Sequence, residues 1–254
     1  MAASAASSAV LVSRGDELVL VIVPVGGGAA IETRLMGAVD HAITGSEWFG
    51  DLLRSGRLDW NGTEWITYST VQRLWPDGVA HYGDTLRHYS AAGAASGVEW
   101  DWGCSHSMDV RLTHSASGET GPVCSSDCYP DKGVFFRHRT TVYLDPSGNC
   151  AGYVQQSLGG VAAIGADFLI GLTSAAGRAS IDPAIARSSG GTVAAPVWLS
   201  DLAGDASDLH VARFEAGAVA AWIDAGEGRV VRLTASGTPV GTPESIPASS
   251  VSGA

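Results

Sequence analysis

Chemically reactive side chains are concentrated in one part of this chain. All four cysteines and most of the seven histidines lie between residues 81 and 150. Within that region His81 and Asp84 flank a glycine, an arrangement that can aim an imidazole and a carboxylate at one metal ion or one substrate. Together with His88 and His106 they form the candidate centre of a hydrolase or metal-dependent enzyme. The alternative is that His88 lies in an outer hairpin strand, where alternation exposes every second side chain.

Aromatic residues in the same region favour binding over catalysis. Tryptophan or tyrosine beside aspartate and histidine is a common surface for stacking on sugar rings or for burying a partner's side chain. Tryptophans also pack between sheets, so each one has a structural alternative. The candidate ligand-binding residues are Trp75, His81, Tyr82, Asp84, Trp100, Trp102, His106, Asp127 and Tyr129.

The cysteines are Cys104, Cys124, Cys128 and Cys150. Structural zinc sites usually bring paired Cys-x2-Cys knuckles, whereas this chain has a single Cys-x3-Cys and two isolated cysteines. An even number favours two disulfides, each contributing about 2–4 kcal/mol of stability, while a metal site and free buried thiols remain alternatives. We expect Cys104 to pair with Cys124 and Cys128 with Cys150. Disulfides would place the protein outside the cytosol, and we assign no metal and no cofactor.

A repeated turn indicates which elements carry these residues. The segment Thr234-Ala-Ser-Gly237 has weaker counterparts ending at Gly93, Gly148 and Gly191, and a fainter one near Val39. The steps between these anchors are 54, 55, 43 and 46 residues. Each unit also contains a short apolar strand, expected to be an inner strand, at residues 18–23, 65–68, 134–136, 168–172 and 219–223.

Repeats of about 40–50 residues built from short strands are typical of β-propeller blades. We therefore predict an all-β fold, a β-propeller of about five four-stranded blades, with a β-sandwich as the second choice. The repeat runs from end to end, so residues 1–254 are expected to form a single domain. The Cys/His/Trp-rich residues at about 97–150 interrupt the repeat and are expected to be an insertion.

Composition restricts the partners and the setting. A hydrophobic content of 45% with 16% charged residues is sufficient for a folded core. The net charge of −11, with one lysine among 15 basic residues, argues against nucleic acid and anionic membrane surfaces as partners. No apolar run approaches the roughly 20 residues that a transmembrane helix requires. The first residues lack a basic segment, so we expect no intact signal peptide here, and either a removed leader or a fragment of a larger propeller.

The last 45 residues carry a family resemblance. Val231-Arg-Leu-Thr-Ala-Ser-Gly-Thr-Pro-Val-Gly-Thr-Pro243, preceded by Ala220-Ala-Trp222, resembles the blade repeat of secreted bacterial β-propeller proteins. The earlier units match loosely, and residues 97–150 depart from the pattern. The resemblance implies a propeller fold and an extracellular or cell-surface setting, and it identifies no functional residue.

These observations favour a secreted or cell-surface binding module that recognises a carbohydrate or protein ligand through the loops at 97–150. Because the candidate ligand residues occur once rather than in every unit, we expect one specific site. The alternatives are the hydrolase or metal-dependent enzyme described above, and a structural scaffold within a larger surface protein. Gly103-Cys-Ser-His-Ser107 does not identify a nucleophile, since serine replaces the second glycine of Gly-x-Ser-x-Gly.

Overall fold

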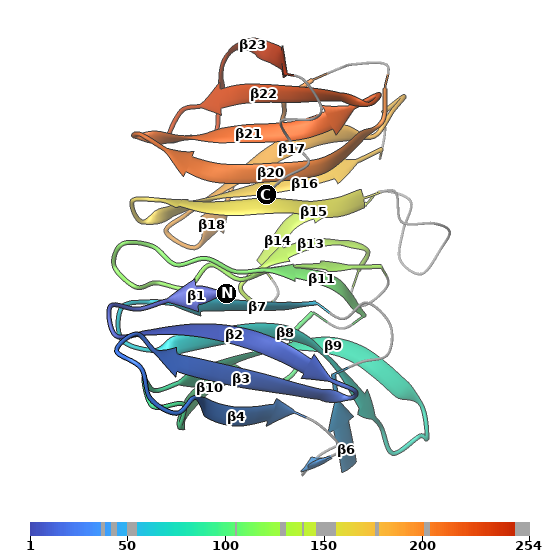
Figure 1. Ribbon diagram of the computed structural model, residues 1–254. Helices are drawn as coiled ribbons and strands as arrows, with labels where there is room; N and C mark the ends of the chain where they lie inside the picture. Colours follow the sequence, from blue (N-terminus) through green and yellow to red (C-terminus); the bar gives the residue numbers. More distant parts are fainter. Residues whose placement is uncertain are drawn as a thin grey trace.

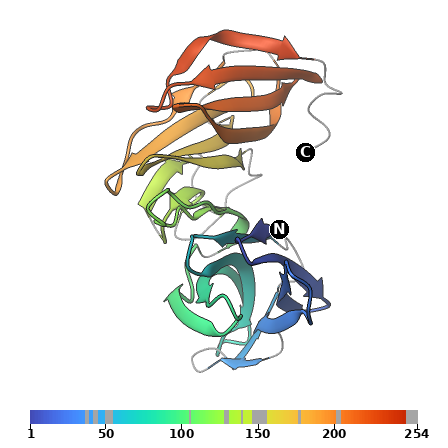
Figure 2. The same ribbon diagram turned by 60° about the vertical axis from the view of Figure 1, so that its left-hand side comes forward.

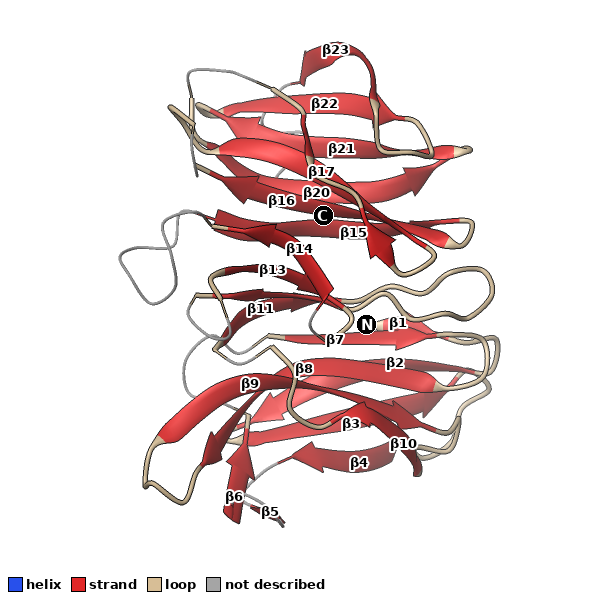
Figure 3. Ribbon diagram, turned by 180° about the vertical axis from the view of Figure 1, so that it is seen from behind, coloured by secondary structure: helices blue, strands red, loops and turns tan. Residues whose placement is uncertain are grey.

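The chain folds into antiparallel β-sheets. A computed structural model describes residues 1–36, 39–41, 45–49, 55–104, 106–127, 131–138, 140–145, 156–175, 178–200 and 204–246. Within these ranges there are 23 strands in five sheets and no helix (Figure 3). The predicted all-β class is therefore confirmed.

Each sheet contains a meander of four consecutive strands, and two sheets carry additional strands. The first sheet holds β1 (Ala2–Ala3), β2 (Ser7–Arg14), β3 (Glu17–Pro24) and β4 (Ile31–Met36). In the second, β7 (Gly56–Trp60), β8 (Trp65–Leu74), β9 (Ala80–Tyr89) and β10 (Ala95–Trp100) are joined by β5 (Val39–His41) and β6 (Gly45–Trp48). The third sheet holds β11 (Ser107–Arg111), β12 (Val123–Ser126), β13 (Gly133–Phe136) and β14 (Thr140–Leu144).

The last two sheets follow the same plan. The fourth holds β15 (Gln156–Ile164), β16 (Asp167–Ser174) and β17 (Asp182–Ser189), with β18 (Thr192–Val193) and β19 (Val197–Trp198) both paired to β17. The fifth holds β20 (Ala206–Phe214), β21 (Gly217–Asp224), β22 (Glu227–Leu233) and β23 (Pro239–Ile246).

The five sheets are arranged as propeller blades. The first strand of each meander contacts the first strand of the next, in the order β1, β7, β11, β15 and β20. These five strands therefore follow one axis, and the remaining strands of each sheet extend away from it. The first and last sheets lie at opposite ends of the molecule, so the blades form an open arc (Figures 1 and 2).

The apolar runs that predict inner strands belong to the middle of each sheet. They fall in β3, β8, β13, β16 and β21, each the second or third strand of its meander. A middle strand is covered on both faces and paired on both edges, which selects a continuous apolar run.

The turn glycines identify equivalent hairpins in three blades. Gly93, Gly191 and Gly237 join the third and fourth strands of their sheets, with φ angles of 79°, 83° and 84°. Glycine adopts this left-handed conformation without steric cost, which explains why the turn recurs in the sequence. Gly148, the fourth anchor, lies outside the described residues.

Residues 97–150, predicted to be an insertion, contain the end of β10 and the whole third blade. The hairpin between β13 and β14 turns through Arg137 and His138, which have φ angles of 43° and 61°. Because this left-handed turn is built without glycine, the hairpin lacks the turn glycine that marks the equivalent hairpins of the second, fourth and fifth blades.

Side chains between the sheets form four buried apolar clusters. Trp65 and Trp222 are fully buried in two of them. One buried polar pair stands apart from these clusters: Lys132 and Asp145 lie 3.3 Å apart, with side chains only 2% and 6% exposed. No helix in the described part of the chain is long and apolar enough to span a membrane.

Candidate functional site

A buried carboxylate lies at the centre of the predicted site. Asp84 on β9 is paired with Thr70 of β8 and is completely buried. Its oxygens accept hydrogen bonds from Tyr68 Oη at 2.9 Å, Trp100 Nε1 at 2.8 Å and the Cys104 amide at 3.1 Å. Burial raises the pKa of Asp84 to about 6, and these hydrogen bonds act in the opposite direction. Burial, followed by the nearby Asp84 charge, raises the pKa of Tyr68 well above its ordinary value.

The segment after β10 is held against the edge of β9. The Gly103 amide donates to the Asp84 carbonyl at 2.9 Å, and the His106 amide donates to the Tyr82 carbonyl at 2.5 Å. Between these two contacts, Cys104 forms a disulfide with Cys124 of β12, with the Cα atoms 6.3 Å apart. The disulfide links this segment to the third blade. Backbone hydrogen bonds and the disulfide together fix the position of His106.

The predicted bond between Cys104 and Cys124 is confirmed. Cys128 and Cys150 lie outside the described residues, so their expected pairing stays a prediction. Asp84 and the two bonded sulfurs come within 4.8 Å of one another. Thiolates are the cysteine form that binds metal, and here both sulfurs are bonded to each other.

Four aromatic side chains come together beside this segment. The Trp75 ring lies edge-on to His81 at 5.9 Å and to Trp102 at 5.6 Å, and His81 lies 6.1 Å from His106. Trp102 packs directly over Gly83, where a Cβ atom would stand 2.7 Å from the indole. We call Trp75, His81, Trp102 and His106 the aromatic–imidazole face.

Each imidazole of this face has a carboxylate beside it. His81 Nε2 lies 3.7 Å from Asp77, and His106 Nδ1 lies 3.6 Å from Asp127. The His81, His106 and Asp127 side chains are each about one third exposed, at 33%, 36% and 37%. The face therefore offers aromatic rings, nitrogen donors and carboxylate acceptors to solvent at one place.

Other predicted residues lie elsewhere. Trp100 packs edge-on against Tyr68 at 5.8 Å and contacts a different apolar cluster from Trp102. His88 lies seven residues from His81 along β9, about 23 Å away at strand spacing. It sits between Glu64 at 3.2 Å and Glu99 at 3.3 Å, and its side chain is 14% exposed.

The four residues of the enzymatic alternative are therefore not brought together. His81 and His106 are neighbours, whereas Asp84 is buried and His88 is distant. His81 and Asp84, three positions apart on one strand, point to opposite faces. Tyr82 is partly buried, and Tyr129 lies outside the described residues.

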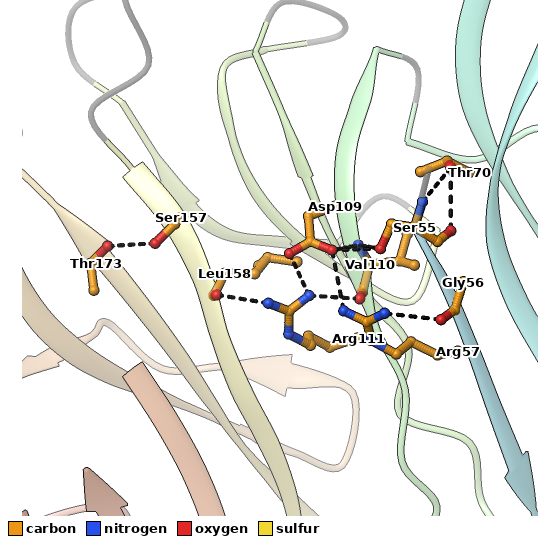
Figure 4. Close-up of polar contacts among 10 residues, drawn as sticks. All are labelled: Ser55, Gly56, Arg57, Thr70, Asp109, Val110, Arg111, Ser157, Leu158 and Thr173. Carbon is orange, nitrogen blue, oxygen red and sulfur yellow. Dashed lines mark hydrogen bonds and ion pairs between the residues drawn. The ribbon is translucent and has the colours of Figure 1, made fainter. Parts of the chain in front are cut away.

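A polar cluster at the axis has no counterpart among the predicted site residues (Figure 4). Asp109 accepts a hydrogen bond from Ser55 at 2.6 Å, lies 3.4 Å from Arg57 Nη2 and is bonded to Arg111. Arg111 also donates to the Leu158 carbonyl at 3.2 Å. The cluster thus joins β7, β11 and β15 of three blades.

Two positive side chains in this cluster, Arg57 and Arg111, contact the same carboxylate, Asp109. Burial, and next the positive charge of Arg111, lower the pKa of Arg57, while Asp109 opposes this. The sequence could have indicated part of this cluster. Asp109 and Arg111 are two residues apart on one strand, and residues two apart point to the same face.

No protein-family model matches the chain, and neither does any curated protein. Solved structures resemble it at low identity. A prolyl endopeptidase is 15% identical with a TM-score of 0.49, and the match covers 94% of this chain and 32% of that one. A xylan β-1,4-xylosidase from Bacillus halodurans C-125 is 11% identical with a TM-score of 0.36, over 91% of this chain and 50% of that one.

A subtype N11 neuraminidase-like protein of a flat-faced bat is 13% identical with a TM-score of 0.31, over 94% of this chain and 70% of that one. The chain thus spans about a third of the length of the prolyl endopeptidase and half that of the xylosidase. Likenesses at this level carry no information about activity. The propeller assignment rests on the five sheets and the order of their innermost strands.

Proposed function

We propose that this protein is a secreted or cell-surface binding module whose ligand rests on the aromatic–imidazole face. The observation that carries the proposal is that Trp75 and His81, from the hairpin between β8 and β9, meet His106, from the segment after β10, on one partly exposed surface. Of the two ligand classes expected from the sequence, a carbohydrate fits this surface better than a protein segment.

The groups on the face suit a sugar. Indole and imidazole rings stack on the apolar face of a pyranose, and carboxylates accept hydrogen bonds from its hydroxyl groups. Asp77 and Asp127 flank the rings at the distances given above, and their side chains are 60% and 37% exposed. Aromatic rings and hydrogen-bonding groups are therefore both within reach of one bound monosaccharide.

Close packing holds the Trp102 ring of the face in place. Trp102 lies against Gly83, and the Arg73 guanidinium, which is 2% exposed, lies 5.2 Å from the Trp102 ring. Asp101 pairs with Arg73 at 3.0 Å and with Arg87 at 3.1 Å. A surface whose rings are already in place loses less conformational entropy on binding.

The setting of the protein is part of the same proposal. The Cys104 to Cys124 disulfide supports an oxidising compartment, such as the cell exterior. The net charge of −11 argues against nucleic acid and anionic membranes as partners. The residues of the face occur in one blade only, which supports one ligand site per chain.

A glycan array followed by calorimetric titration of the best hit tests the proposal. We expect Trp75→Ala to weaken binding by at least about tenfold, because it removes the central ring of the face. Trp198→Ala is the matched control. Trp198 is also partly exposed and ring-stacked, lying 6.2 Å from Tyr143 and 4.3 Å from the Arg178 guanidinium in the fourth blade.

Circular dichroism establishes that both variants fold. If Trp75→Ala bound as tightly as wild type, or if Trp198→Ala lost as much affinity as Trp75→Ala, the aromatic–imidazole face would be excluded as the binding site. An array without hits would overturn the carbohydrate assignment, and a screen of extended peptides on the same two variants then tests the protein-ligand alternative.

A further inference from the structure

A second polar site lies at the other end of the innermost strands. A groove of about 200 Å³ runs between the segment after β11 and the strands β15 and β20. Its walls include Thr113, His114, Ala162, Ala163, Ala212 and Arg213. His106 precedes β11 and His114 follows it, so the groove and the aromatic–imidazole face lie at opposite ends of that strand.

His114 is oriented by a carboxylate from another blade. Its Nδ1 lies 2.7 Å from Oδ2 of Asp59 on β7, and the other Asp59 oxygen accepts the Trp60 amide at 2.9 Å. Because Nδ1 faces Asp59, Nε2 is the ring nitrogen left for the groove. When the imidazole carries both of its protons, both ring nitrogens donate, and Nε2 then donates into the groove.

Arg213 supplies the opposite wall. It is exposed and has no ion-pair partner among the residues that the structure describes. None of the described residues that line the groove is an aspartate or glutamate, although the whole chain carries a net charge of −11. A concave surface that carries an arginine and lacks a carboxylate among its described lining residues attracts anions.

We propose that this groove binds a phosphate or sulfate group. Arg213 donates a charge-assisted hydrogen bond, the doubly protonated His114 ring donates from Nε2, and the Thr113 hydroxyl is a third donor. The methyl side chains of Ala162, Ala163 and Ala212 leave the space that the anion fills. This groove shares no residue with the aromatic–imidazole face, so the two proposed sites are independent.

Titration of the folded protein with inorganic phosphate and inorganic sulfate, followed by the His114 ring resonances in NMR spectra, tests this site. We expect saturable shifts with both anions. Arg213→Gln should weaken binding at least about tenfold, as expected for a lost charge-assisted hydrogen bond. Arg34→Gln, which makes the same charge change at an exposed pair with Glu17 in the first blade, is the control.

Glucose 6-phosphate and acetate distinguish the source of the anion. Tighter binding of glucose 6-phosphate than of phosphate would identify the natural ligand as an anionic group on a sugar, and equal binding would identify the free anion. Acetate should shift the ring least. Shifts that do not saturate, or equal weakening by Arg34→Gln and Arg213→Gln, would overturn the proposal.

Discussion

The contact between the second and third blades differs from the contact between the fourth and fifth. At the first, the completely buried Asp84 gathers three donors, and a disulfide crosses between the sheets. At the second, β15 lies against β20 through glycine: a Cβ at Gly159 would meet Leu209 at 2.9 Å, and one at Gly160 would meet the Val211 amide at 2.4 Å. The contact between the second and third blades therefore depends on hydrogen bonds and a disulfide. The contact between the fourth and fifth depends on the close approach of two strands at glycines.

The difference explains where the chemistry lies. Close apolar packing holds two sheets together without fixing any polar side chain, and it tolerates changes that keep the volume. A buried polar network requires every partner to be in place, and it therefore positions the segments attached to it. The aromatic–imidazole face is attached to the Asp84 network through Gly103, Cys104 and the His106 amide.

Removing the centre of the polar contact should have the largest effect. Asp84→Ala leaves the Tyr68 hydroxyl, the Trp100 indole and the Cys104 amide buried without their acceptor, at a cost of about 3–5 kcal/mol in the free energy of unfolding. Asp84→Asn keeps an acceptor oxygen and should cost less. Urea denaturation measures both, and a loss below about 1 kcal/mol in Asp84→Ala would mean that the network is not what holds this contact.

Removing the disulfide should have the second-largest effect on stability. Replacing Cys104 and Cys124 by alanine frees a segment of 20 residues in the unfolded chain, a loss of about 3 kcal/mol. Ligand affinity at the aromatic–imidazole face should fall as well, because His106 lies within the released segment, two residues after Cys104. Intact mass before and after reduction and alkylation establishes the bond in the wild type, and full alkylation without reductant would contradict it.

Acidity should strengthen the polar contact and leave the apolar one unchanged. The folded-state pKa of Asp84, about 6, stands above its ordinary value of 3.8, so the folded protein binds the proton more tightly than the unfolded chain. Lowering the pH from about 6 to about 4 should therefore stabilise wild type relative to Asp84→Asn, by at most about 3 kcal/mol. The free energy of unfolding of both proteins, measured by urea denaturation between about pH 6 and about pH 4, tests this prediction. If wild type instead lost stability relative to Asp84→Asn as the pH falls, a raised pKa of Asp84 would be excluded.

The contact between the fourth and fifth blades should be sensitive to substitution at Gly160. Gly160→Ala places a methyl group against the Val211 backbone, and overpacking of this kind costs about 1–3 kcal/mol. Gly26→Ala is the matched control, since a Cβ there meets nothing within 4 Å and the φ angle is not left-handed. Thermal unfolding compares the two, and similar melting temperatures would show that the blades can separate slightly without loss.

The sequence predicts the blades better than it predicts the sites. Turns at Gly93, Gly191 and Gly237 were recognisable because each needs the left-handed conformation that glycine adopts freely. In the third blade the apolar run at 134–136 was recognisable but the turn was not, since its hairpin turns through Arg137 and His138. A periodic signal disappears wherever a residue other than glycine occupies the equivalent turn.

The sites depend on contacts between distant residues, which spacing does not reveal. Trp75, His81 and His106 were predicted because they are few and of suitable chemistry, but the burial of Asp84 follows from tertiary packing. His114 and Asp59 are 55 residues apart and meet only because β7 and the segment after β11 belong to neighbouring blades. The cysteine pair was predicted from number and proximity, and only the structure shows that it joins two sheets.

The buried pair of Lys132 and Asp145 gives the chain an internal reporter. Lys132 is the only lysine in the sequence, and its side chain is 2% exposed. An amine-reactive reagent can reach its Nζ only when the third sheet opens, so the rate of acylation at this residue follows local opening rather than surface exposure. Mass spectrometry of the peptide that contains Lys132 would then measure how often the surroundings of this side chain open.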